Sequence, residues 1–465
     1  MRRTKLIATL GPATDGPGVL DDLVAAGLDV ARLNSSHADR PQLERQLAAV
    51  RTAAGRAGRH VAVMLDLGGA KLRLGDVAPG TVLAPGQTFE LRGADAPGDA
   101  TGASVSHTAL ADDVAEGDRV LIDDGRIELA VAGTAAAVVH TTVRVGGALS
   151  SRKGVNVPGV HLGVDGITAR DLELLAWALD AGVDIVAQSF VRSAEDVVRL
   201  RAAMGERIIP IVAKIEKHEA MDALDAIVEA ADGVMVARGD LGVELPLEEV
   251  PAAQRRIVAA ARTAGRPVVV ATQMLESMTE SRRPTRAEAS DVANAIFDAV
   301  DAVMLSGETA VGLHPVHVLE TMERIVRAAE EVAVEHPWTP RPGASDDVAA
   351  AVSRAVRDLA ESLDLAAIVT VTQSGATARA VAARRPRVPV LAATPDEAVA
   401  RRLALVWGVH PTVIGTYESI DEMIEAASAA VRDTGLAAPG DLIAVTGGVA
   451  VHVAGSTNLI QVHRV

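Results

Sequence analysis

Short apolar runs alternate with amphipathic stretches along much of the chain. The runs at 4–10, 29–33 and 60–67 are rich in β-branched residues and too short to be free-standing helices. Between residues 219 and 231, by contrast, apolar side chains recur at helical spacing. Runs that are apolar throughout are typical of strands buried on both faces of a parallel sheet. The pattern therefore predicts repeated strand–helix units.

The number of these units indicates a closed barrel. Five further strands are expected to end near residues 190, 216, 240, 273 and 308, which brings the count to eight, the number that closes a (β/α)₈ barrel. Polar residues follow these strands directly, on the face where such barrels carry their sites. Helices are expected over residues 19–26, 41–57, 171–181, 194–203, 219–231, 251–264 and 286–299.

Two parts of the chain depart from this rhythm. Between residues 71 and 158, short β-like runs separated by Gly, Pro and Asp predict a small inserted β-rich domain. A proline-rich break at 336–343 predicts a domain boundary. After it, strands and helices alternate again, but with a different spacing along the chain. We therefore expect an α/β protein: a barrel formed by 1–70 and 159–338, an insertion at 71–158, and a C-terminal open-sheet domain at 343–465.

Composition excludes several classes of protein. No stretch of about 18 apolar residues lacks charge, so no membrane span is expected. The net charge of −16 argues against general nucleic-acid binding. The chain contains no cysteine, which rules out disulfides and thiolate metal sites and is compatible with a reducing cytoplasm. The first apolar run leads directly into a Gly-Pro turn, so we do not expect a signal peptide.

Lysine is scarce, and its positions are informative for that reason. The chain has 40 arginines but only five lysines. A compact ammonium differs chemically from a planar guanidinium, so the remaining lysines are candidates for sites where arginine fails. Chance retention is the alternative for some of them. They are Lys5, Lys71, Lys153, Lys214 and Lys217.

Charged residues gather where two neighbouring strands end. Glu216 and Asp240 are carboxylates of the kind that bind Mg²⁺ or Mn²⁺. Lys214 lies two residues before Glu216, on the same face of its strand, and Arg32 adds a second cation from another strand end. Two cations beside a divalent metal can hold a phosphoryl group or a developing oxyanion. Surface ion pairs are the alternative explanation for any one of these features.

Longer motifs resemble the pyruvate kinase family over nearly the whole chain. They include TKLIATLGPAT, DVARLNSSH, SRKGVNVPG, VAKIEKHE, DGVMVARGDLGVELP, PTRAEASDVANAI and VMLSGETAVG. The resemblance implies transfer of the phosphoryl group of phosphoenolpyruvate to ADP, with Mg²⁺ or Mn²⁺, to give pyruvate and ATP. It also implies a small β-barrel lid over the barrel's mouth, an effector-binding C-terminal domain, a homotetramer and a cytoplasmic location.

The resemblance further implies roles for the residues at matching positions. Lys214 would neutralise the transferring phosphoryl group and the enolate oxygen, and Glu216 and Asp240 would ligate the divalent metal. The backbone of Gly239 and Asp240, with the Thr272 hydroxyl, would hold the substrate carboxylate. A proton would reach the enolate through water near Thr272, Ser306 and Glu308. The residues implied to contact phosphate or the nucleotide are Arg32, Asn34, His37, Arg73 and Lys153, of which Arg32 and Arg73 are implied to be catalytic.

A monovalent-cation site is also implied. Many members of the family hold K⁺ with Asn, Ser and Asp side chains that match Asn34, Ser36 and Asp66. Those members typically carry Glu and Thr where this chain has Lys71 and Leu67. We expect the Lys71 ammonium to lie beside Asp66 and to supply the charge that K⁺ would bring, so that K⁺ is not required.

Two further positions bear on regulation and on the lid. The loop with Thr372, Ser374, Gly375 and Thr377 precedes a helix and could cradle a phosphorylated effector by its N–H groups. An ordinary strand-to-helix turn is the alternative there. Ala70 stands where the family usually has proline, at the junction with the insertion, so it bears on how the lid is oriented.

Two other functions are compatible with parts of this pattern. A barrel lyase or mutase acting on phosphoenolpyruvate would use the same metal and enolate chemistry, but the inserted lid favours phosphoryl transfer. A non-catalytic, effector-binding paralogue would not need the charged cluster at the mouth. Lys214, Glu216, Asp240 and Thr272 are all present, which disfavours that reading.

Overall fold

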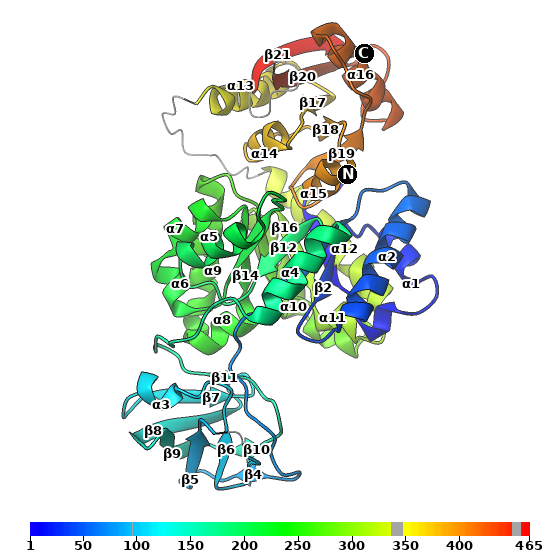
Figure 1. Cartoon of the computed structure of the whole chain (residues 1–465). Helices are drawn as coiled ribbons and strands as arrows, with labels where there is room; N and C mark the ends of the chain where they lie inside the picture. The colour runs from blue at the N-terminus through cyan, green and yellow to red at the C-terminus, as the bar shows by residue number, and fades with distance from the viewer. Residues whose placement is uncertain (95, 336–346, 449–456) are drawn as a thin grey trace.

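A computed structural model describes residues 1–94, 96–335, 347–448 and 457–465. It shows three bodies in a row, with a barrel in the middle, the insertion at one end and the C-terminal domain at the other (Figure 1). The predicted boundary at 336–343 lies outside the described residues. In the part of the chain that is described, no helix is both long and apolar enough to cross a membrane.

The central body is a closed barrel of eight parallel strands, as expected. β1 pairs with both β2 and β16, and this pairing closes the barrel. The strands are β1 (Lys5–Thr9), β2 (Val30–Asn34), β3 (Ala62–Leu67), β12 (Ile185–Gln188), β13 (Ile211–Ile215), β14 (Gly233–Ala237), β15 (Val268–Ala271) and β16 (Ala302–Leu305).

Helices surround the barrel, and side-chain caps start several of them. Thr168 and Asp171 form a capping box at α4, and Thr285 and Glu288 form one at α10. The helices are α1 (Val19–Ala25), α2 (Arg40–Ala57), α4 (Ala169–Ala181), α5 (Ala194–Ala203), α6 (His218–Asp222), α7 (Leu224–Ala230), α8 (Arg238–Glu244), α9 (Val250–Thr263), α10 (Arg286–Phe297), α11 (Gly307–Ala310) and α12 (Pro315–Glu335), with 3₁₀ turns η1 (Pro12–Thr14), η2 (Leu247–Glu249) and η3 (Glu276–Thr279).

The single helix predicted at 219–231 is wrong in detail. The structure has two short helices there, α6 and α7, which meet at Ala223. The apolar stripe is nevertheless real, because Ala220, Leu224, Ile227 and Val228 are all buried. Periodicity identified the buried face, but it did not detect the interruption.

The insertion has its own sheet and its own core. Six strands in the order β11-β7-β8-β9-β5-β6, with a two-stranded ribbon, bury Phe89, Val120 and Leu129 among others. The elements are β4 (Val82–Leu83), β5 (Thr88–Arg92), β6 (Gly102–Ser104), α3 (Leu110–Asp113), β7 (Arg119–Ile122), β8 (Ile127–Ala135), β9 (Val138–Val145), β10 (Gly147–Ala148) and β11 (Val155–Asn156).

The C-terminal domain is an open five-stranded sheet, as expected. Its order is β19-β18-β17-β20-β21, and all neighbours are parallel except the last pair. Its elements are α13 (Val348–Ser362), β17 (Ala367–Val371), α14 (Ala376–Ala382), β18 (Val390–Thr394), α15 (Glu397–Leu403), β19 (Val409–Val413), α16 (Ile420–Asp433), β20 (Leu442–Gly448) and β21 (Thr457–Arg464).

The two smaller bodies lie at opposite ends of the barrel. At the amino end of the strands, Ala404 and Leu405 of the C-terminal domain belong to the same buried cluster as the residues of the barrel's inner core, such as Ile7 and Met304. At the carboxyl end, Lys71 of the insertion contacts Asp240 just after β14. The insertion therefore meets the face on which the predicted site lies.

Candidate active site

Lys214 lies at the centre of a polar cluster at the carboxyl end of the barrel. Its Nζ is 2.8 Å from Ser189 Oγ, 3.2 Å from Asp66 Oδ1 and 2.9 Å from Glu216 Oε1. Burial alone would lower the pKa of Lys214, but the two carboxylates outweigh it and hold the pKa above its usual value. The ammonium is therefore a fixed positive charge at neutral pH.

Asp66 links Lys214 to Arg32. Arg32 Nε donates to Asp66 Oδ2 at 2.7 Å, and its Nη1 donates to Thr9 Oγ1 at 2.9 Å. Burial would raise the pKa of Asp66, but Lys214 and Arg32 together hold it below its ordinary range. One ionised carboxylate thus holds two cations from two different strands.

Glu216 has an oxygen suited to a metal ion. Its Oε2 accepts the backbone N–H of Phe190 at 2.8 Å, whereas its buried Oε1 accepts no hydrogen bond from the described residues and faces only the Lys214 ammonium. Burial raises the pKa of Glu216, Lys214 opposes this shift, and the nearby Asp240 carboxylate adds to it. Glu216 Oε1 has only the Lys214 ammonium as its partner and is repelled by the Asp240 carboxylate, so Glu216 and Asp240 could hold a divalent cation and fit the implied metal.

Lys71 lies elsewhere than expected. Its Nζ is 2.9 Å from Asp240 Oδ1 and 3.9 Å from Asp124 Oδ1, so it pairs with an implied metal ligand and not with Asp66. The placement beside Asp66 is therefore corrected. The physical reason is that both oxygens of Asp66 are already taken by Arg32 and Lys214.

The other implied monovalent-site positions make contacts of their own. Asn34 Oδ1 accepts the backbone N–H of Ser36 at 3.1 Å. Leu67 is buried in the core around the barrel. Asp66 is occupied by its two cations. The side-chain oxygen of Asn34 and both oxygens of Asp66 are therefore already engaged within the protein.

The Thr272 loop has a strained backbone. Thr272 and Gln273 adopt φ values of 69° and 53°, which are uncommon for residues with a side chain. The Arg238 guanidinium donates to both carbonyl oxygens and pairs with Asp291 at 2.6 Å. The Thr272 hydroxyl accepts the N–H of Gly239 at 2.7 Å, which brings together the two groups implied to hold a carboxylate. Sequence reasoning did not identify Arg238 as the support for this loop.

The lid residues and His37 lie around the mouth. Arg73 donates to the carbonyl of Arg152 at 3.1 Å, and Lys153 pairs with Asp123 at 2.8 Å, so both are held within the insertion. Partial desolvation lowers the pKa of His37, although its side chain is exposed, and the positive charges of Arg73, Arg32 and Lys71 lower it further. His37 is therefore neutral at pH 7 and faces a positive region.

Glu308 and Ser306 complete the opposite wall. Glu308 is fully buried, and its two oxygens accept the N–H groups of Leu275 at 3.1 Å and Ser306 at 2.6 Å. The Ser306 hydroxyl is buried and has no hydrogen-bond partner among the described residues. A water molecule is the simplest partner for such a group.

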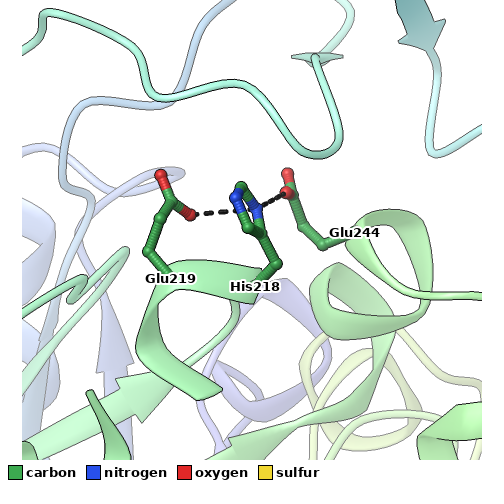
Figure 2. Close-up of side chains that lie close together, drawn as sticks. All are labelled: His218, Glu219 and Glu244. Atoms are coloured by element: carbon green, nitrogen blue, oxygen red, sulfur yellow. Dashed lines mark hydrogen bonds and ion pairs between the residues drawn. The ribbon is translucent and has the colours of Figure 1, made fainter. Parts of the chain in front are cut away.

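A second carboxylate cluster lies beside the site. Figure 2 shows His218 between Glu219 and Glu244, with its Nδ1 at 3.1 Å from one and 3.5 Å from the other. Glu244 also accepts from Lys217 Nζ at 2.6 Å and from Asn156 Nδ2 at 2.9 Å. Because Glu244 is already neutralised, we interpret the cluster as an anchor for the returning lid strand β11.

The candidate effector loop is ordered by its own side chains. Thr372 Oγ1 accepts the N–H of Gly375 at 2.9 Å, and Thr377 Oγ1 lies 2.6 Å from Thr457 Oγ1. The carbonyl of Ser374 accepts from Arg379 at 3.2 Å. The loop lies between β17 and α14, as the sequence predicted.

Comparison with known proteins agrees with this geometry. Residues 1–319 match the pyruvate kinase barrel domain, and residues 350–463 match the pyruvate kinase alpha/beta domain. The pyruvate kinase of Mycobacterium intracellulare is 46% identical over 100% of this chain and 98% of its own. That of Mycobacterium tuberculosis is 45% identical over the same shares, and that of Geobacillus stearothermophilus is 45% identical over 99% of this chain and 80% of its own. The chain belongs to the pyruvate kinase family of phosphotransferases.

Proposed function

We propose that the Lys214 cluster carries out the family's reaction in this chain, the transfer of the phosphoryl group of phosphoenolpyruvate to ADP. The observation that carries the assignment is that Asp66 and Glu216 each lie within 3.2 Å of the Lys214 Nζ at the barrel's mouth. Phosphoryl transfer needs little covalent help, so positioned positive charge supplies most of the catalysis.

Each group has a defined task in this proposal. Arg32 and Arg73 bind the phosphate, and Lys214 neutralises the phosphoryl group and the enolate oxygen as charge moves between them. The substrate carboxylate takes the N–H groups of Gly239 and Asp240, and so replaces the internal hydrogen bond from Gly239 to Thr272. Glu216 and Asp240 would hold a divalent metal, Mg²⁺ or Mn²⁺, which when bound would add positive charge near the transferring group.

The nucleotide would be held at the lid side of the mouth. Asn34, His37, Arg73 and Lys153 are the proposed contacts, which requires the insertion to close over the barrel. A proton would reach the enolate through water near Thr272 and the buried Ser306 hydroxyl. This route is supported because the Ser306 hydroxyl has no hydrogen-bond partner among the described residues and could therefore bind a water. We also propose, on the family resemblance alone, a homotetramer in the cytoplasm.

A coupled assay for pyruvate, run with and without ADP, tests the proposal. We expect turnover that depends on ADP and yields one ATP for each pyruvate. Pyruvate formation without ADP would indicate a lyase instead. Bound phosphoenolpyruvate with no turnover under any condition would indicate a non-catalytic paralogue.

A further inference from the structure

Four arginines line a small pocket where the barrel meets the C-terminal domain. Arg262 lies in α9 and Arg266 follows that helix, so both belong to the barrel. Arg379 lies in α14 and Arg385 follows it, so both belong to the C-terminal domain. We call this the arginine pocket. It is at the opposite end of the barrel from Lys214.

The charge around the arginine pocket is unbalanced. Asp301 is the only carboxylate among the residues that line it. Its oxygens are shared between Arg385 at 3.1 Å and the backbone N–H groups of Val268 at 3.0 Å and Trp407 at 3.3 Å. The Asp232 carboxylate does not line the pocket, but its negative charge acts to raise the pKa of Arg379. Asp232 is already paired with Arg201 at 2.8 Å. Positive charge is therefore in excess.

Buried donors in the pocket lack acceptors. Arg385 is nine-tenths buried, with 10% of its side chain exposed, and its Nη1 has no hydrogen-bond partner in the described part of the chain. Its Nη2 is held by the carbonyl of Ala299 at 2.8 Å, and the guanidinium stacks 4.4 Å from the Trp407 ring centre. Arg266 Nε is likewise buried without an acceptor. An unsatisfied buried donor is costly, and it is more so on a cation.

Electrostatics point in the same direction. Burial lowers the pKa of Arg262 and the neighbouring Arg385 lowers it further, while Asp301 opposes both without reversing the shift. A guanidinium remains protonated despite such shifts, so the arginines stay mutually repelling charges. An anion in the pocket would relieve this repulsion.

We propose that the arginine pocket binds a phosphate dianion, either free or as the end of a phosphorylated metabolite. Planar guanidiniums match the oxygens of such an ion by paired hydrogen bonds. Because two arginines come from each domain, the bound ion would tie the barrel to the C-terminal domain. Arg379 also donates to the carbonyl oxygen of Ser374, so binding of the ion to Arg379 would change the contacts of the 372–377 loop. The proposal does not depend on the catalytic assignment.

Phosphate binding to the full-length chain, measured by calorimetry, tests this proposal. The double variant Arg266→Gln/Arg379→Gln removes two guanidiniums but keeps the Arg385 contacts, and Arg56→Gln, at an exposed arginine paired with Asp21, is the matched control. We expect the double variant to bind one phosphate fewer per chain, or to bind it at least tenfold more weakly, and the control to match wild type. Equal stoichiometry and affinity in all three proteins would overturn the proposal.

A crystal soaked in selenate locates the ion even if the double variant fails to fold. An anomalous peak between Arg266 and Arg379 would support the proposal, and peaks only at the barrel's mouth would refute it. A parallel titration with glycerol phosphate separates the two sources. Binding of both ions indicates a general phosphate site, and binding of the ester alone indicates a phosphorylated metabolite. Binding of neither at this position rejects the site.

Discussion

At the scale of residues, the Asp66 carboxylate holds the Arg32 and Lys214 cations close to each other. Its two oxygens hold Arg32 at 2.7 Å and Lys214 at 3.2 Å, and the carboxylate itself is almost fully buried. A buried carboxylate between two cations stays ionised, so the cations keep their positions without a substrate. Such preorganisation is what electrostatic catalysis requires.

Replacing Lys214 tests the catalytic assignment most directly. Lys214→Met should leave phosphoenolpyruvate affinity within a few-fold but reduce turnover by several orders of magnitude. The ammonium acts mainly on charge that develops in the transition state, and one such donor is worth roughly a hundred- to a thousand-fold. Steady-state kinetics would measure this effect.

The control for that experiment is a nearby lysine that is also paired with a carboxylate. Lys217→Met removes an ammonium from Glu244 at 2.6 Å, outside the catalytic cluster, and should keep turnover within about tenfold of wild type. Thermal melts of both variants would show that they are folded. Turnover of Lys214→Met within tenfold of wild type would remove Lys214 from its assigned role.

Lys71 leads to a prediction about monovalent ions. We expect near-full activity with Mg²⁺ in buffer free of K⁺ and Na⁺, and less than two-fold stimulation by KCl. Both oxygens of Asp66 are already paired with Arg32 and Lys214, so this carboxylate has no negative charge left for a monovalent ion to neutralise. Choline chloride at the same concentration controls for ionic strength. Lys71→Glu should lower activity, and a wild-type enzyme nearly inactive without K⁺ would contradict the idea.

The lysines also show what the sequence could and could not reveal. Their scarcity made all five of them candidates for special sites. Lys214 and Lys71 lie in the polar cluster at the barrel's mouth, and Lys153 is held within the insertion. The other two also have specific partners, because Lys217 pairs with Glu244 and Lys5 Nζ donates to the carbonyl of Val409. The second contact spans 404 residues and joins two domains, so no local pattern could predict it.

At the scale of elements, β13 and β14 place the two proposed metal ligands side by side. The strands pair in parallel, with Lys214 opposite Met235, so their carboxyl ends finish together. Glu216→Gln and Asp240→Asn should each raise the Mg²⁺ concentration needed for half-maximal rate, because each removes one negative charge from a site with few ligands.

Glu244→Gln is the matched control for the metal variants. Glu244 is a buried carboxylate in the neighbouring His218 cluster, at the end of α8, and it is satisfied by Lys217 and Asn156. We expect its Mg²⁺ titration to match wild type. If Glu244→Gln alone shifted the titration, the metal would belong to the cluster in Figure 2 instead.

The β17–α14 loop carries the prediction about regulation. If it binds a phosphorylated metabolite, that ligand should tighten phosphoenolpyruvate binding, and phosphoenolpyruvate should tighten effector binding by the same factor. Calorimetry on the full chain, with and without the other ligand, checks both directions. Failure of a panel of sugar phosphates and nucleotides to bind would leave the loop as an ordinary turn.

Element type was more predictable than element length. The barrel strands were recognisable because a run such as Gly233–Ala237 is apolar throughout and fully buried. The two-residue strands β10 and β11 are too short to show any period, so they were missed. The β8–β9 turn places Ala136 and Ala137 at positive φ, a conformation that favours glycine, so two alanines gave no indication of this turn in the sequence.

At the scale of the whole molecule, Lys5 makes stability depend on pH at the junction between barrel and C-terminal domain. Burial lowers the pKa of Lys5 to about 8, with Asp29 opposing this shift. The folded state therefore releases a proton near pH 8 that the unfolded chain keeps to about pH 10.5. Between these values the unfolded state binds more protons, so stability rises with pH.

Chemical denaturation at pH 7, 8, 9 and 10 checks this sign. Relative to Lys5→Met, the wild type should gain up to about 1.4 kcal/mol for each pH unit above 8, and the difference should be flat below pH 8. A difference that stayed constant from pH 7 to 10 would show that Lys5 titrates normally.

Ala404 and Leu405 have a consequence for how the chain can be cut or recombined. They complete the inner core of the barrel from a segment that lies almost 100 residues beyond its last strand. The barrel is thus not a self-contained module, although the insertion, with its separate core, is one. An engineer could exchange the insertion between homologues as a cassette. A barrel produced alone would lack Ala404 and Leu405, so other apolar residues would first have to be designed to close its inner core.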